Sequence, residues 1–163
     1  MFIFGGHNSP KTRLNDTWVL TVKDFEWARV GGDKDNLTNQ DSSIGAPAPR
    51  ANTSATLYDN KIYLFGGHGG INYARTSFND LYCFDLETET WELIVPASSH
   101  KPEPRGGHSV FASDQKVYIY GGWNNEMQFN KVEVFDLEKK EWTDPDVDNG
   151  IHRWNHSSVL VEA

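Results

Sequence analysis

The stretch of sequence that decides the fold begins with Pro104-Arg105-Gly106-Gly107-His108-Ser109 and ends at Trp142. Between these ends lie Lys-Val-Tyr-Ile-Tyr-Gly-Gly at 116–122 and Val-Glu-Val-Phe-Asp at 132–136. Short runs rich in Val, Ile, Tyr and Phe, bounded by Gly, Asp and Asn, are typical of β-strands and are too short for helices. The stretch therefore predicts a succession of short strands.

The same order of residues occurs once more upstream in complete form. It consists of Pro49-Arg50, a run of Tyr-Leu-Phe-Gly-Gly at 63–67, Phe84-Asp85 and Trp91. Arg50 precedes Gly66 by 16 positions, and Arg105 precedes Gly121 by the same 16. Because the spacing is constant while the loops vary in length, the pattern indicates one supersecondary unit that has been copied.

This unit resembles the kelch repeat. It has a strand that ends in paired glycines, a following strand that ends in an aromatic residue and Asp, and a Trp about twenty positions after the glycines. Gly66 and Gly121 are 55 positions apart, close to the kelch period of roughly 50. The resemblance implies an all-β fold, namely a segment of a kelch-type β-propeller with four-stranded antiparallel blades. Rings of this kind have about 4–8 blades, so about three blades leave the ring open within one chain.

The repeats divide the 163 residues into blades. We expect a partial blade 1 at 1–30, a long polar and mobile loop at 28–49, blade 2 at 50–95, blade 3 at 105–145, and the first strand of a further blade at 153–163. Three sources could complete the ring: a longer chain, which we favour, a second copy that exchanges Ser157–Val161 to give six blades, or another subunit. An exposed blade face is not expected to persist alone.

Composition excludes several classes of function. The net charge of −8 repels phosphate backbones, so nucleic acid is not expected as a partner. Cys83 is the sole cysteine, which suits a reducing compartment, and no apolar run has the length of a signal peptide or a membrane span. The sequence predicts a cytoplasmic protein without a membrane partner. The resemblance to kelch proteins adds a possible association with the cytoskeleton.

Two sets of residues are expected to be structural. The paired glycines accept positive φ and carry no Cβ where a strand must turn near the packed ring interior. Each repeat Trp is expected to pack as a wedge between adjacent sheets. These structural residues are Gly5, Gly6, Gly66, Gly67, Gly121, Gly122, Trp27, Trp91 and Trp142.

The candidate partner-binding residues lie in the loops after the glycine pairs and around each Pro-Arg position. Arginine forks and amphipathic aromatics are enriched at binding hot spots. The candidates are Arg50, Arg105, Arg153, Tyr73, Arg75, Trp123, Asn124 and Trp154. The kelch resemblance implies that the three Pro-Arg-position arginines face the central cavity. An alternative is that each arginine binds a carboxylate such as Asp85 or Asp136 and only stabilises the fold.

Metal binding and catalysis have weaker support. His108 and His156 occupy one repeat position, but Thr53 fills it in blade 2, which favours structural histidines. Asp144, Asp148 and His152 resemble the iron site of nitrile-specifier kelch proteins, although Asp replaces Glu and the loop contains Pro and Gly. We therefore expect no cofactor, no metal and no catalytic residue.

The function predicted from the sequence is non-catalytic protein binding. The chain is expected to act as a scaffold or adaptor within a cytoskeletal or other large assembly, and to bind its partner through blade-tip loops. One alternative is an iron-dependent specifier or another kelch-propeller enzyme. The other is a ubiquitin-ligase propeller that recognises substrates.

Overall fold

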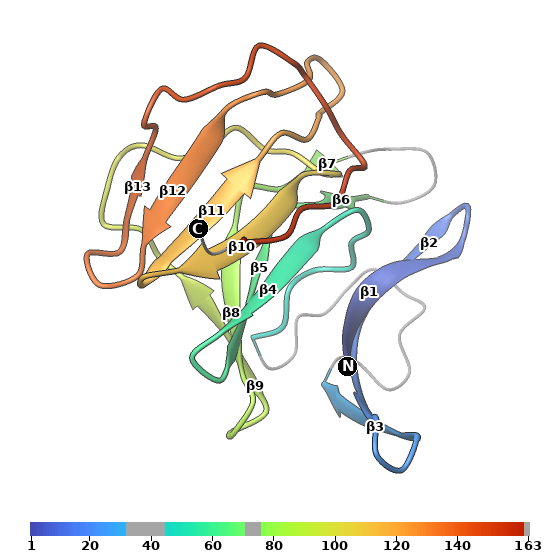
Figure 1. The fold of residues 1–163 in the computed structure, drawn as a ribbon. Coiled ribbons are helices and arrows are strands. Elements are labelled where there is room, and N and C mark those ends of the chain that lie inside the picture. Colours follow the sequence, from blue (N-terminus) through green and yellow to red (C-terminus); the bar gives the residue numbers. More distant parts are fainter. Residues whose placement is uncertain (32–44, 71–75, 162–163) are drawn as a thin grey trace.

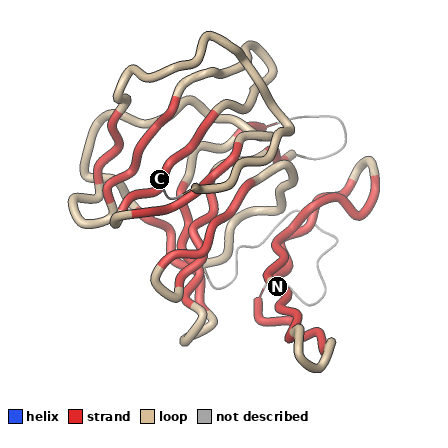
Figure 2. The backbone as a smooth tube through the Cα atoms, viewed as in Figure 1, coloured by secondary structure: helices blue, strands red, loops and turns tan. Residues whose placement is uncertain are grey.

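The structure, a computed structural model, describes residues 1–31, 45–70 and 76–161, and within these ranges it contains strands and no helix (Figures 1 and 2). The strands are β1 (Phe2–Ser9), β2 (Thr12–Thr21), β3 (Glu26–Gly31), β4 (Ser54–Tyr58), β5 (Lys61–Phe65), β6 (His68–Gly69), β7 (Thr76–Ser77), β8 (Leu81–Asp85), β9 (Thr90–Ile94), β10 (Ser109–Ser113), β11 (Lys116–Tyr120), β12 (Val132–Asp136) and β13 (Glu141–Thr143).

Three antiparallel blade sheets follow one another in chain order (Figure 1), and β6 and β7 form a separate two-stranded sheet in the loop after the second glycine pair. Blade 2 has the order β4-β5-β8-β9, and blade 3 repeats it as β10-β11-β12-β13. The register is repeated as well, since Ser54 pairs with Phe65 and Ser109 pairs with Tyr120. The predicted all-β fold, with four-stranded antiparallel blades and no closed ring in the described chain, is confirmed.

Blade 1 is a three-stranded sheet, β1-β2-β3, without the strand that corresponds to β4 or β10. β1 extends beyond the paired glycines to Ser9, and its pairing with β2 shifts register between Phe4 and Gly6. The irregularity coincides with φ values of 60° at Gly5 and 103° at Gly6, which residues with a side chain rarely adopt. The glycine pair therefore bends the strand as the sequence predicts.

The hydrophobic core lies between the blades rather than within them. Trp91 of blade 2 packs on Phe2 and Phe4 of blade 1, with ring centroids 6.1 and 5.1 Å apart, and its Nε1 donates to Thr17 Oγ1 at 3.0 Å. Trp142 of blade 3 packs in the same way on Phe65 of blade 2, at 5.4 Å. Each buried Trp thus packs onto the preceding blade.

Trp27 departs from the expectation that all three repeat tryptophans are wedges. It is 48% exposed, whereas Trp91 is 8% and Trp142 2% exposed. The cause is positional, because Trp27 belongs to blade 1 and the described chain holds no blade before it. Ile3, in the same blade, is 41% exposed. One broad face of blade 1 therefore presents apolar side chains to solvent.

A ladder of backbone hydrogen bonds joins neighbouring blades at the glycine pairs. The second glycine of each pair donates its N–H to the carbonyl of the next arginine, Gly6 to Arg50 at 2.9 Å and Gly67 to Arg105 at 2.8 Å. A Cβ on Gly66, the first of its pair, would lie 2.6 Å from the Arg105 oxygen. Glycine is therefore required there both by its φ of 59° and by the close approach of the next blade.

The C-terminal segment differs from the prediction. The first strand of a further blade was expected at 153–163, but residues 153–161 contain no strand in the structure. A strand forms by pairing with a neighbouring strand, and none of the described strands pairs with this segment. Val159 and Val161 are consequently 82% and 76% exposed.

Candidate partner-binding face

Arg50, predicted to bind a partner, is fully buried. Its guanidinium lies 4.0 Å above the Phe78 ring, donates to the Gly66 carbonyl at 2.9 Å, and binds both carboxylate oxygens of Asp80. This is a bidentate charge-assisted pair whose donors are used within the blade. A further blade would only add cover, so direct contact between Arg50 and a partner is excluded in this arrangement.

Arg105 has the same surroundings in blade 3. Its side chain is 1% exposed, lies 3.7 Å above the Phe129 ring and donates to the Gly121 carbonyl at 3.4 Å. The ion pair is looser than that of Arg50, with Arg105 Nη2 3.6 Å from Glu133 Oε1. Burial lowers the pKa of Arg105 to about 10 in spite of the nearby carboxylate. Arg50 and Arg105, which the sequence predicts to bind a partner, are thus both buried in the structure and paired within their own blades.

The alternative reading of these arginines was correct in kind but named the wrong acids. Asp85 and Asp136 lie at the ends of their strands that are far from the arginines. There Asp85 Oδ1 accepts hydrogen bonds from the N–H groups of Glu87 and Thr88 and so closes a hairpin turn. The hydrogen bond from Lys61, together with these two backbone bonds, lowers the pKa of Asp85 to about 2. Asp80 and Glu133 are the carboxylates that reach the arginines.

Arg153 and Trp154 have different surroundings from their counterparts in the earlier repeats. Arg153 is half-buried, lies 6.0 Å from the Tyr120 ring and forms no ion pair within the described residues. Trp154 is 45% exposed and occupies the position that holds Ala51 and Gly106 in the other repeats. A position that elsewhere takes a small residue here presents a large aromatic ring to solvent.

Trp154 lies next to a pocket formed by the loop after the third glycine pair. Its ring centroid is 5.5 Å from that of Trp123, which in turn lies 4.8 Å from that of His68. The pocket has a volume of about 530 Å³. It is lined by Trp123, Asn124, Asn125, Glu126, Met127, Gln128 and His152. Two of the predicted residues, Trp123 and Asn124, therefore line one concave site, and Trp154 adjoins it.

The loop that forms this pocket is held by its own hydrogen bonds. Asn124 Oδ1 accepts the N–H groups of Glu126 at 2.9 Å and Met127 at 2.8 Å, and the Asn124 N–H donates to the Met127 carbonyl at 2.9 Å. An Asn side chain that bonds the backbone two residues ahead forms an Asx turn, which fixes the loop locally. Met127 is thereby held 53% exposed at the mouth of the pocket.

Some predicted residues cannot be placed, and some pocket residues were missed. Tyr73 and Arg75 lie outside the described residues, as does most of the long loop predicted at 28–49. Glu126, Gln128 and His152 line the pocket but were not predicted to bind a partner, and His152 was named only as a candidate iron ligand. Met127 and Gln128 belong to a loop whose length differs from that of blade 2, and this variability was the available signal for a recognition loop.

His108 and His156, which were predicted to be structural, lie where neighbouring repeats pack together. His108 is 4% exposed and packs edge-on against Phe65 with centroids 5.3 Å apart. Burial, with the charge of Arg105 as a second cause, lowers the pKa of His108 to about 3. His156 Nε2 lies 3.0 Å from Ser109 Oγ. Both rings belong to the packing between repeats.

The candidate iron ligands are not assembled into a site. Asp144 and Asp146 both hold the Lys131 ammonium, at 3.2 and 2.6 Å. Among the described residues, no group of three or more His, Cys, Asp or Glu side chains is placed to hold a metal ion. The buried Cys83 thiol has a pKa raised to about 11 by burial, so it stays protonated at neutral pH.

Comparison with known proteins shows the family. The sequence matches the family described as the KLHDC2/KLHL20/DRC7 Kelch-repeats domain over residues 1–163. The chain therefore belongs to the kelch-repeat family, and its blades are those of a kelch β-propeller segment. In the part of the chain that the structure describes, no helix is both long and apolar enough to cross a membrane.

Three curated relatives illustrate how widely this repeat is used. The leucine-zipper-like transcriptional regulator 1 homolog of Drosophila melanogaster is 30% identical over 151 residues, covering 90% of this chain and 14% of that protein. The acyl-CoA-binding domain-containing protein 4 of Arabidopsis thaliana is 26% identical over an alignment of 212 residues, covering 99% and 31%. The N-(sulfonatooxy)prop-2-enimidothioate sulfolyase of Thlaspi arvense is 37% identical over 97 residues, covering 59% and 27%. The chain spans less than a third of each relative.

Proposed function

We propose that this chain is a non-catalytic protein-binding module that engages a partner through the Trp123–Phe129 loop and Trp154. The observation that carries the proposal is the exposed Trp154 ring at a repeat position that elsewhere holds a small residue. Large aromatics at the edge of a preformed pocket are the usual anchors of protein interfaces. Kelch-repeat domains typically mediate protein interactions, which agrees with this assignment.

The chemistry of the pocket suits a polypeptide with an apolar anchor. Met127 supplies adaptable and Trp154 rigid apolar surface, and the side-chain amide of Gln128 can pair with backbone N–H and C=O groups. Because Asn124 already fixes the loop, little conformational entropy is lost when a partner binds. The part played by the module in a cytoskeletal or other large assembly belongs to the same proposal.

Affinity capture with matched variants tests the proposal. Trp154→Ala installs the residue that the repeat carries at Ala51, so the variant is expected to fold. Proteins retained by the unaltered chain should fall at least tenfold with Trp154→Ala and with Met127→Ala, as expected for loss of a hot spot of about 1.4 kcal/mol or more.

The matched control is Phe25→Ala, which removes a 76% exposed aromatic ring from a turn of blade 1. It should retain every partner that the unaltered chain retains. Equal capture by Trp154→Ala and the unaltered chain would overturn the proposal. Arg105→Glu is unsuitable for this purpose, because a carboxylate buried in place of a paired arginine would unfold the blade.

An enzymatic activity is the second candidate, and one observation favours it, the 37% identity to a relative that is named a sulfolyase; the iron site named from the sequence is the form that can be tested. Asp144, Asp148 and His152 would be its ligands, although Asp144 is bound to Lys131. Metal analysis of protein purified without chelators separates the two candidates. We expect no stoichiometric iron, whereas one iron per chain that is lost in His152→Ala would establish the second.

A further inference from the structure

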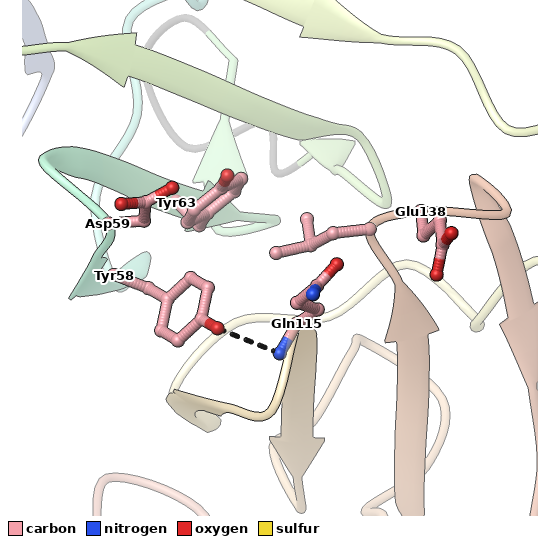
Figure 3. Close-up of a pocket in the computed structure, with 6 residues that line it drawn as sticks. Tyr58, Asp59, Tyr63, Gln115 and Glu138 are labelled. Carbon is pink, nitrogen blue, oxygen red and sulfur yellow. Dashed lines mark hydrogen bonds between the residues drawn. The ribbon is translucent and has the colours of Figure 1, made fainter.

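A second pocket, shown in Figure 3, is formed by turns at the ends of β5 and β11 that are opposite the glycine pairs, whereas the Trp123–Phe129 loop follows the third glycine pair. Three turns form it. They are the β4–β5 turn with Asp59, the β10–β11 turn with Gln115, and the residues that follow β12. Its volume is about 670 Å³, within the range of ligand pockets. It is lined by Tyr58, Asp59, Tyr63, Gln115, Leu137 and Glu138.

The walls of this pocket are aromatic and are fixed from both blades. The backbone N–H of Gln115 donates to Tyr58 Oη at 3.0 Å, which ties blade 3 to blade 2. Tyr63 is 7% exposed, and burial raises its pKa to about 12, so its phenol is neutral at physiological pH. The two tyrosine rings and the partly buried Leu137 therefore form an uncharged wall.

Two carboxylates lie on opposite sides of this wall. Figure 3 shows Asp59 beside Tyr63 on one side and Glu138 across the pocket from the two tyrosines. Both acids are solvent-exposed and come from different blades. No ion pair involves Asp59 or Glu138 within the residues that the structure describes. A cation in the pocket would lie beside two tyrosine rings, with a carboxylate on each side of the pocket, and aromatic rings and carboxylates together attract organic cations.

The lysines nearby in the sequence are not among the residues that line the pocket. Lys61 Nζ is held by Asp85 at 2.8 Å, and this bond raises the pKa of Lys61. Lys139 and Lys140 follow Glu138 in the same exposed turn, and the charge of Lys139 is one cause of the lowered pKa of Asp136. The lining residues themselves include two acids and no base.

We propose that the pocket between Tyr58, Tyr63, Leu137 and Gln115 binds the lysine or arginine side chain of a polypeptide partner, with Asp59 and Glu138 as its counter-ions. The alkyl part of such a side chain packs on the tyrosine rings and Leu137, and its charged head lies between the two carboxylates. The side-chain oxygen of Gln115 adds an acceptor. This surface is separate from the Trp154 face, so either can fail without the other.

The test is a titration of the full 163-residue chain, observed by the NMR signal of the Gln115 backbone amide. The probe is N-acetyl-lysine methylamide, and the matched neutral control is N-acetyl-norleucine methylamide. Because the Gln115 N–H bonds Tyr58, occupation of the pocket should shift its resonance. We expect saturable shifts at millimolar lysine probe that weaken as salt rises, and at least fivefold weaker binding of the norleucine probe.

Variants locate the interaction. Asp59→Asn suits its turn, because φ is 48° at Asp59 and Asn tolerates that region, and Glu138→Gln changes an exposed side chain. Each variant should weaken lysine binding at least threefold, while Asp24→Asn, at an exposed turn of blade 1, should leave it unchanged. Equal binding of the two probes, unaltered binding in both carboxylate variants, or no shift at Gln115 would each overturn the proposal.

Discussion

Trp142 and Trp27 occupy the same position in their repeats, and only their neighbours differ. Trp142 is 2% exposed against blade 2, whereas Trp27 is 48% exposed on the open side of blade 1. Truncation of a buried Trp removes packing and leaves a cavity. Trp142→Ala should lower the free energy of unfolding by about 3–5 kcal/mol, and Trp27→Ala by about 1 kcal/mol or less. Urea unfolding measures both, and similar losses would contradict wedge packing between blades.

His108 makes the stability of the protein depend on pH. Its pKa is about 3 in the folded chain because of burial and Arg105, against about 6.5 when unfolded. Between these values the unfolded chain binds one more proton, so stability is full above about pH 6.5 and is lost as pH falls towards 3. From pH 7.5 to 5 the contribution of this residue is about 2 kcal/mol.

His108→Thr, which installs the residue found at Thr53, should reduce that acid-induced loss. Urea midpoints at pH 7.5 and pH 5 measure it for both proteins. His156, whose pKa is also lowered by burial, contributes equally to both. An unchanged pH dependence in the variant would contradict the burial of an uncharged His108. The lower overall stability expected from the smaller side chain does not affect this comparison.

At the residue scale, the sequence predicted the glycines and the buried tryptophans but not the arginine partners. The repeat offers Asp80 and Asp85 at the two ends of one strand, and spacing alone does not choose between them. The register does, since Phe65 faces Leu81 and Lys61 faces Asp85. Arg50 reaches the Gly66 end, so it binds Asp80. In blade 3 Lys131 replaces that Asp, and Glu133, two residues later on the same face, takes its role.

The loop from Trp123 to Phe129 is the element on which recognition depends. Asn124 holds its turn through two backbone N–H groups. Asn124→Ala should weaken partner binding by several-fold, because an unfixed loop must lose entropy on binding, while global stability changes by about 1 kcal/mol or less. Calorimetric titration with a captured partner and thermal unfolding measure the two effects. Unchanged affinity would contradict preorganisation by this turn.

The predicted strands formed where the partner strand belongs to the same repeat. The predicted strand at the C-terminus, whose partner would belong to another repeat, did not form. β5 and β8 contain the residues identified before the glycines and at Phe84-Asp85 in blade 2, and β9 contains Trp91, because each of these strands has a neighbour within the repeat. Ser157–Val161 has a similar sequence pattern but no paired strand. The turn of the Asn124 loop depends on side-chain hydrogen bonds, and the loop differs in length and sequence from its counterpart in blade 2, so periodicity cannot reveal the turn or the pocket beside it.

At the scale of the whole molecule, three blades leave two faces without a neighbour. Ile3 and Trp27 mark the face of blade 1, and among the described residues no carboxylate pairs with Arg153 as Asp80 does with Arg50. We propose that further blades cover these faces, whether they come from a longer chain, a second copy or another subunit. Blade contacts of the kind seen at Trp91 would then continue in both directions.

An isolated chain of these 163 residues should associate through those faces. Sedimentation over a range of concentrations should show self-association, and Trp27→Lys should reduce it because a charge then replaces the exposed ring. A monomer that stays monodisperse at high concentration, with cooperative unfolding, would contradict the need for neighbouring blades. Val22→Lys, at an exposed position of the β2–β3 turn, is the control for added charge.

The most direct measurement of partner recognition is amide hydrogen exchange of the chain with and without a captured partner at saturation. Partner binding is predicted to slow exchange in residues 123–129 and 152–155, around the pocket and Trp154. The buried strands β5 and β11 should exchange slowly in both states. Unaltered exchange in both loop segments, with slowing elsewhere, would contradict recognition through this face.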